Sequence, residues 1–128
     1  MALPALLVAG CSGDDGTEVD ADALAEGPCQ QLAEPLSEVG GLVAALRDGD
    51  LDPADDADAG DADGRADAAQ DGLRAVRDTA DDPVVDAVTG LANDLGVLRV
   101  AVATEQVGDA VLDQVTAGRD EVLAACSA

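Results

Sequence analysis

The sequence predicts an all-α protein, a small up-and-down helical bundle of four helices that follows a disordered acidic N-terminal tether. Ala and Leu, which favour helices, are abundant, whereas the chain has no aromatic residue and no Ile to fill a β-sheet. Apolar residues also recur alternately three and four positions apart, which is typical of helices with one buried face. Each fully buried Leu or Val contributes about 1.5 to 3 kcal/mol before entropy is counted, so a core of Leu, Val and Ala is expected to be thin.

The bundle is expected over residues 28–126, and its first helix from Pro28 to Arg47. Six apolar residues of this segment lie on one helical stripe: Cys29, Leu32, Leu36, Val39, Val43 and Leu46. Pro35 removes a helical hydrogen bond, and Gly40 and Gly41 each cost about 1 kcal/mol relative to Ala. A kinked or late-starting helix is therefore expected.

Residues 48–63 are a low-complexity run of Asp, Ala and Gly, which predicts an acidic interhelical linker that buries nothing. The second helix is expected from Gly64 to Ala80. Its inner stripe would consist of Ala66, Ala69, Leu73, Val76 and Ala80. Arg74 and Arg77 lie at helical spacings from Asp residues, which predicts solvated surface pairs worth a few tenths of a kcal/mol each.

The third helix has the clearest start, because Asp81-Asp82 supplies a capping Asp and Pro83 follows at the first helical position. Its inner stripe would be Val84, Val88, Leu91, Leu95, Leu98 and Val102. The fourth helix is expected to begin near Thr104 or Asp109 and to bury Val111, Val115, Gly118, Val122 and Cys126. Gly108 followed by Asp109 is a weak stop, so one long helix is the alternative.

The N-terminal segment contains an aliphatic residue and two small residues directly before a cysteine: Val8, Ala9, Gly10 and Cys11. This run resembles the lipobox of bacterial lipoproteins, in which the signal peptide is cut before a cysteine that carries a diacylglyceryl group. The resemblance implies cleavage between Gly10 and Cys11, a lipid on Cys11, and a position on the extracytoplasmic face of the cell membrane. Residues 1–10 are then the remnant of a signal peptide whose basic region is missing, and residues 11–27 form a flexible tether. The alternative is a cytosolic protein in which Cys11 is an ordinary buried cysteine.

Three cysteines are an odd number, and a lipid on Cys11 leaves Cys29 and Cys126 as one pair. Outside the cytoplasm this pair can form a disulfide; two free buried thiols are the alternative. The two residues lie at the entry of the first helix and the exit of the last, and these ends meet only if the number of helices is even. The whole pattern is similar to small secreted lipoproteins of high-GC Gram-positive bacteria, a resemblance that implies no particular activity.

The net charge of −22 argues against a nucleic-acid partner and against electrostatic attraction to anionic lipids, so membrane attachment is expected to be covalent. The chain has no His, Lys or Tyr, so a non-enzymatic protein without catalytic residues or cofactors is expected. Asp48, Asp50, Asp52 and Asp55 are spaced like the carboxylates of a calcium loop. Pro53 replaces the glycine that such a loop needs, so no metal site is assigned and the run is interpreted as a charged spacer.

Two classes of function fit these observations. The first is a membrane-anchored binding or spacer module whose protein or small-molecule partner the sequence does not identify. The alternative is a carrier that holds a small apolar ligand between its helices, or a weak binder of divalent cations. A core without aromatic side chains leaves room for a ligand only if the helices do not close up around it.

Overall fold

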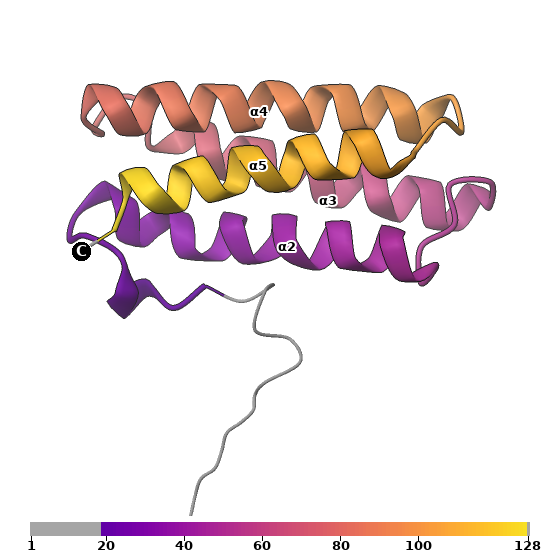
Figure 1. The fold of residues 1–128 in the computed structure, drawn as a ribbon, viewed down its shortest axis with the longest axis horizontal. Helices are drawn as coiled ribbons and strands as arrows, with labels where there is room; N and C mark the ends of the chain where they lie inside the picture. Colours follow the sequence, from indigo (N-terminus) through magenta and orange to yellow (C-terminus); the bar gives the residue numbers. More distant parts are fainter. Residues whose placement is uncertain (1–18, 128) are drawn as a thin grey trace, which may run out of the picture.

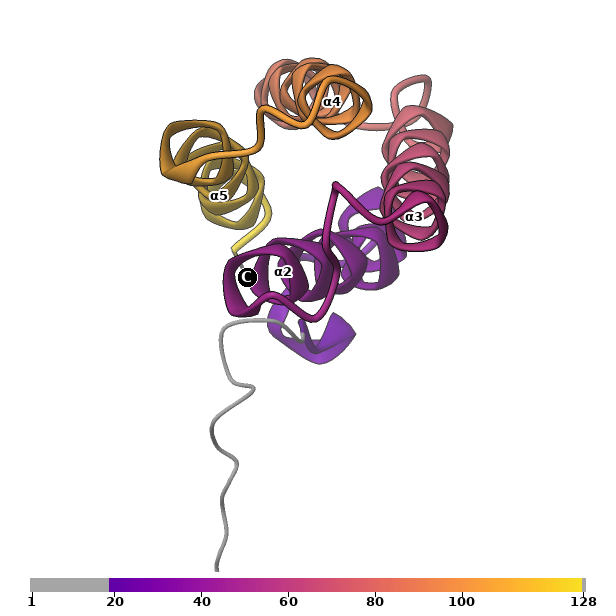
Figure 2. The ribbon, with the colours of Figure 1, turned by 90° about the vertical axis from the view of Figure 1, so that its right-hand side faces the viewer.

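Residues 19–127, which the computed structural model describes, contain four α-helices that run alternately up and down (Figure 1). The helices are α2 (Ala33–Asp48), α3 (Asp56–Ala75), α4 (Asp82–Ala103) and α5 (Asp109–Ala125), preceded by the 3₁₀ turns η2 (Ala21–Ala23) and η3 (Pro28–Leu32). Each α-helix packs against two others, and α2 lies diagonally opposite α4 (Figure 2). The prediction of an all-α, up-and-down bundle of four helices is confirmed.

The late start expected for the first helix is also confirmed, because the chain forms the 3₁₀ turn η3 before α2 begins at Ala33. Pro35 is the third residue of α2 and lies in the first turn, where backbone N–H groups have no helical acceptor, so its missing N–H costs little. The helix ends at Gly49, whose φ of 83° is left-handed and is tolerated because glycine has no Cβ.

The predicted linker over residues 48–63 is wrong in its second half, since α3 begins at Asp56 rather than at Gly64. The side chain of Asp55 caps this helix and accepts hydrogen bonds from the backbone N–H groups of Ala57 (2.9 Å) and Asp58 (3.3 Å). Carboxylates in the first turn also favour the helix through its dipole, and alanine is the strongest helix former. The segment buries side chains as well, because Leu51 and Ala62 are 7% and 1% exposed.

The second helix ends at Ala75 rather than at Ala80, and α4 then begins at Asp82. Asp81 occupies the N-cap position, as predicted, but its side chain makes no capping hydrogen bond. An N-cap side chain accepts from the second or third helical N–H. Pro83 is the second residue of α4, rather than the first as predicted, and has no N–H, so only that of Val84 is left for such a bond.

The third and fourth helices are separate, and the later of the two expected starts, Asp109, is confirmed. The chain leaves α4 after Ala103 and turns at Glu105, whose φ of 56° is left-handed. The predicted inner face of α5 needs one correction. Leu112 is buried and Val111 is only half-buried, so Leu112 takes the place on the inner face that was predicted for Val111.

The core lies between the four helices and consists of Leu, Val and Ala side chains. The largest side chains that are fully buried are Leu32, Leu36, Leu42, Leu73, Leu91, Leu95, Leu98, Val39, Val76, Val88, Val115 and Val122. Every member of the predicted α4 stripe is buried, since the spacing of three and four positions keeps those residues on one helical face. Within residues 19–127, no helix has the length and apolar composition needed to cross a bilayer.

Residues 19–27, which we call the strap, were predicted as part of a tether over residues 11–27 but pack against the bundle. Leu24 is 4% exposed and belongs to the core cluster, with a β-bridge to Ser127. The backbone N–H of Val19 donates to Ser37 Oγ at 2.8 Å, and that of Ala25 donates to Cys126 O at 2.7 Å. The acidic composition obscured these apolar anchors, and any tether is confined to residues before Val19.

Candidate functional site

The predicted pair Cys29 and Cys126 lies at disulfide distance, with the sulfur atoms 2.18 Å apart and the Cα atoms 5.6 Å apart. This separation falls in the range of about 4.4 to 6.8 Å that a disulfide allows. The predicted pairing of the two cysteines, and with it the prediction of an even number of helices, is therefore confirmed. The proposed cleavage site at Gly10 and the proposed lipidation site at Cys11 lie outside the described residues.

The disulfide end of the bundle also carries a small hollow of about 120 Å³. The strap, α5 and the loop before α4 surround it, with Ala25, Glu26, Pro28, Cys29, Thr79, Ala80, Asp81, Val84 and Ala125 in its lining. Because the strap N–H of Ala25 bonds to the carbonyl of Cys126, this hollow is built from both ends of the described chain.

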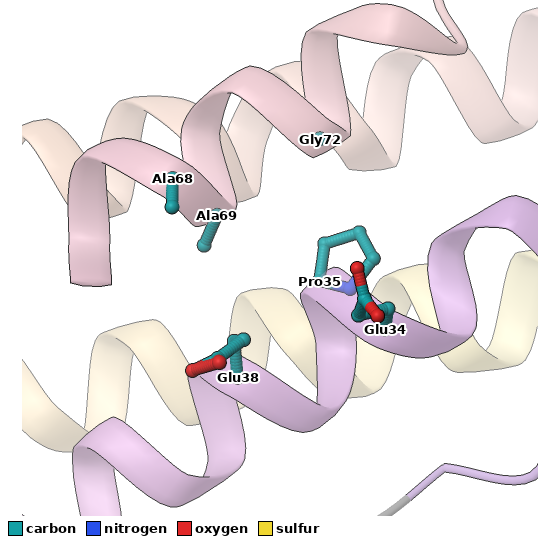
Figure 3. A pocket seen from close by; sticks show the side chains of 6 residues that line it. All are labelled: Glu34, Pro35, Glu38, Ala68, Ala69 and Gly72. Atoms are coloured by element: carbon teal, nitrogen blue, oxygen red, sulfur yellow. The ribbon is translucent and has the colours of Figure 1, made fainter.

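A larger groove, of about 210 Å³, lies on the surface between α2 and α3. Figure 3 shows its walls: α2 contributes Glu34, Pro35 and Glu38, and α3 contributes Ala68, Ala69 and Gly72. The α3 wall has only methyl groups and a glycine facing α2, so the helices leave an open space that larger side chains would fill. The groove is smaller than the roughly 300 to 1,000 Å³ of pockets that hold drug-sized molecules.

The position of the groove depends on a close contact between Pro35 and Gly72. A methyl group built on Gly72 would lie 2.9 Å from Cγ of Pro35, which is shorter than real carbon contacts. Glycine at this place therefore lets the proline ring approach the α3 backbone. The sequence predicts only that Pro35 disturbs a helix, since nothing in the pattern pairs a proline with a glycine on another helix.

Two carboxylates stand at the rim of the groove, because Glu34 and Glu38 are one helical turn apart on α2 (Figure 3). Glu38 forms an ion pair with Arg65 of α3, with Oε1 and Nε 3.6 Å apart and both side chains partly exposed. Within residues 19–127, Glu34 has no ion pair. The groove thus combines an apolar floor with a negatively charged edge that is only partly neutralised.

A polar network holds α3 against α4 away from the groove. The guanidinium of Arg99 donates to both carboxylate oxygens of Asp63, at 2.8 and 3.2 Å, and to Asp67 at 3.0 Å. It also donates to Gln70 Oε1 at 2.9 Å, and the buried Gln70 amide donates to Ala92 O at 2.9 Å. The hydrogen bond from Arg99 lowers the pKa of Asp63, which is typical of a structural ion pair.

Asp94 of α4 lies against α5, and burial raises the pKa of its carboxyl group. Gln114 Nε2 donates to its Oδ1 at 3.0 Å and acts in the opposite direction, while the negative charge of Glu121 adds to the rise. Gly118 makes room for it, since a methyl group there would lie 2.6 Å from Asp94 Oδ2. This carboxyl is thus packed into the α4–α5 contact rather than into a cleft.

Arg119 of α5 is a buried cation that the sequence analysis did not identify, and it is 7% exposed. Its Nε donates to the backbone carbonyl of Leu36 at 2.8 Å, which links α5 to α2. Burial lowers the pKa of the guanidinium, and the nearby carboxylate of Asp120 acts in the opposite direction. The spacing of the apolar residues did not predict the burial of Arg119, because Gly118 occupies the neighbouring inward position.

Two of the four carboxylates that are spaced like a calcium loop accept hydrogen bonds from the backbone instead. Asp52 Oδ1 accepts from the N–H of Ala54 at 2.9 Å, and Asp55 caps α3. Across residues 19–127, no three acidic or cysteine side chains converge in a way that could hold a metal ion. This acidic run therefore forms a turn and the start of α3.

No family model matches the chain, and comparisons with curated proteins and with solved structures likewise find no match. The function is therefore inferred from the residues of this chain alone. Their strongest features are the cysteine pair that joins the chain ends and the acid-rimmed groove between α2 and α3.

Proposed function

We propose that this protein is a lipid-anchored, non-enzymatic binding module on the extracytoplasmic face of the cell membrane. The observation that carries the proposal is the pairing of Cys29 with Cys126, which leaves Cys11 as the one remaining cysteine of the sequence. Disulfides persist in oxidising compartments and are rare in the cytosol. Cys11 follows two small residues, as a lipidated cysteine does, so a single assignment accounts for all three cysteines.

The packing of the bundle supports a surface-binding role over a carrier role. The large core side chains of all four helices are fully buried against one another, and the groove and the hollow described above lie at the surface. A carrier of an apolar ligand needs an apolar cavity between its helices, as bundles that bind cofactors have. A surface module needs only an exposed, shaped contact site.

The α2–α3 groove is the contact site that the geometry favours, and its occupant would be a basic side chain of a partner. Its volume suits one long side chain rather than a whole small molecule. The alkyl stem of an Arg or Lys would lie on Pro35 and Ala69, and the charged group would meet Glu34 at the rim. The net charge of −22 would also attract a basic partner.

Intact mass spectrometry of the protein from the membrane fraction of its native host tests the anchor. We expect loss of residues 1–10, added acyl mass on Cys11, and two fewer hydrogens for the disulfide. Cys11→Ala should leave the chain unprocessed and without acyl mass, while Ser12→Ala serves as the matched control and should be processed normally. A full-length, unmodified chain with three free thiols would contradict the proposal.

An NMR titration with a capped Gly-Arg-Gly peptide tests the groove, with the citrulline peptide as the uncharged control. The amide signals of Glu34, Ala69 and Gly72 should shift in a saturable way with the arginine peptide alone. Ala68→Leu fills the groove without changing the charge and should abolish the shifts, whereas the exposed Ala75→Leu should not. Equal binding to both variants would show that only the net charge attracts the peptide, and would exclude the groove.

A further inference from the structure

We propose that the strap determines which side of the bundle faces the membrane, so that α2 lies toward the bilayer and α4 away from it. The inference rests on the proposed lipid anchor at Cys11, and it adds the orientation in which that anchor presents the protein. Three observations carry it: where the strap is attached, how short the chain is between Cys11 and that attachment, and how thick the bundle is.

The strap begins on the α2 side of the molecule, at Val19, and its later residues Leu24 and Ala25 pair with the chain end that follows α5. The N–H of Val19 bonds to Ser37 of α2 at 2.8 Å, and Leu24 is buried in the core cluster. In Figures 1 and 2 the strap, in indigo, lies beside α2 on the side opposite α4. The chain therefore reaches the bundle next to α2, and any anchor placed before Val19 pulls on that side.

Only eight peptide units join Cys11 to Val19, and they span at most about 29 Å when fully extended. If the whole segment to residue 27 were free, its reach would be about 58 Å, and every face of the bundle could meet the membrane. The packing of the strap thus halves the greatest distance between the lipid and the bundle.

The bundle is thick compared with this reach, and the comparison decides which face can meet the membrane. Helices about 11 Å wide whose axes lie about 9 Å apart give a diagonal of about 24 Å from the outer face of α2 to the outer face of α4. With α4 against the bilayer, the chain from Val19 would first have to reach the edge of the α2 side, about 12 Å, and then descend the full thickness. That path of about 36 Å is longer than the 29 Å that the backbone from Cys11 to Val19 can span, so this orientation would require a fully stretched connection.

Electrostatic attraction to lipids does not set the orientation of the bundle. The chain has no cationic face that anionic lipids could attract, since its six cations are Arg residues among 28 acids. Within residues 19–127, acids of the bundle form ion pairs with Arg47, Arg65, Arg74 and Arg99, and Arg119 is buried. Arg77 is a single exposed cation and makes no cationic face by itself. The orientation is thus set by the position and length of the connection.

Energy transfer on vesicles tests the orientation. The full chain with its disulfide intact is coupled through the thiol of Cys11 to a maleimide lipid in phosphatidylcholine vesicles that contain acceptor-labelled lipid. A donor is attached through an unnatural amino acid at Ala44, seven residues after Ser37 on the same face of α2, or at the exposed Val97 of α4. We expect several-fold faster transfer from residue 44 than from residue 97.

A control variant lengthens the connection by inserting sixteen Gly and Ser residues after Gly16, which leaves the bundle unchanged. Transfer from the two sites should then become nearly equal. Equal transfer in the original chain, faster transfer from residue 97, or a difference that survives the insertion would each overturn the inference. Because thiol coupling replaces acylation in this experiment, its result is independent of the mass measurement that tests the lipid anchor itself.

Discussion

Removing the disulfide between Cys29 and Cys126 is expected to lower the free energy of unfolding by about 4.7 kcal/mol. The two residues are 97 positions apart, and closing a loop of about this length removes that much chain entropy from the unfolded state. The loss is large beside the roughly 5 to 15 kcal/mol that stabilises a typical domain. A core without aromatic side chains places this protein toward the lower end of that range, so the bond decides whether the bundle is stable.

The measurement is urea unfolding followed by circular dichroism, comparing Cys11→Ser with the triple variant that adds Cys29→Ser and Cys126→Ser. The shared Cys11→Ser background prevents exchange between thiols. With a slope of about 1.5 kcal/mol per molar urea, the midpoint should fall by about 3 M. Reduction of the Cys11→Ser protein by dithiothreitol should give the same midpoint as the triple variant.

The reasoning assumes that the bond acts on the unfolded chain rather than on helix packing. The refolded triple variant should therefore keep its helical signal wherever it is stable, for example in sulfate at low urea. A loss below about 1 kcal/mol would refute the entropic account, because the long loop could not then contribute as calculated. Helices that rearrange in the reduced protein would refute it as well.

Four further predictions concern particular side chains and the total charge. Gly72→Ala should destabilise the protein because its methyl group would meet Pro35, whereas Gly60→Ala, in open space on the same helix, should stabilise it by up to about 1 kcal/mol, as urea unfolding will show. Asp94→Asn should raise stability at pH 7 and not at pH 3, since the raised pKa means that the native state favours the protonated acid and loses this contribution as pH rises. Asp63→Asn should do the reverse, because its lowered pKa contributes stability above the unfolded value of about 3.9 that is lost as pH falls. The melting temperature of the unmodified protein should rise with NaCl, because salt screens its net charge of −22.

The sequence was a good guide wherever large apolar side chains repeat. In α4, Val88, Leu91 and Leu95 fix both the helix and its buried face, because three- and four-residue steps keep them on one side. The cysteines supplied the long-range information that such a pattern lacks. A disulfide between the first and last helices requires their ends to meet, which periodicity alone could not have established.

Two of the errors share a physical cause, which is that small and acidic residues occur in both helices and loops. The start of α3 was missed because Asp55 caps a helix as readily as it populates a linker. The strap was missed because Leu24 is its one fully buried large side chain, with Val19 only partly buried, and one buried side chain leaves no period to detect. Arg119 was missed because its hydrogen bond to Leu36 depends on a neighbouring helix.

The small residues of α3 also create the groove. Ala68, Ala69 and Gly72 have too few atoms to fill the seam with α2, and Pro35 occupies only part of it. Larger side chains at these positions would have given α3 a clear apolar stripe in the sequence and would also have closed the groove. The weak helical pattern and the open contact site are therefore two consequences of the same choice of residues. For this reason Ala68→Leu is an informative change, because it should remove binding while the core of the bundle stays as it is.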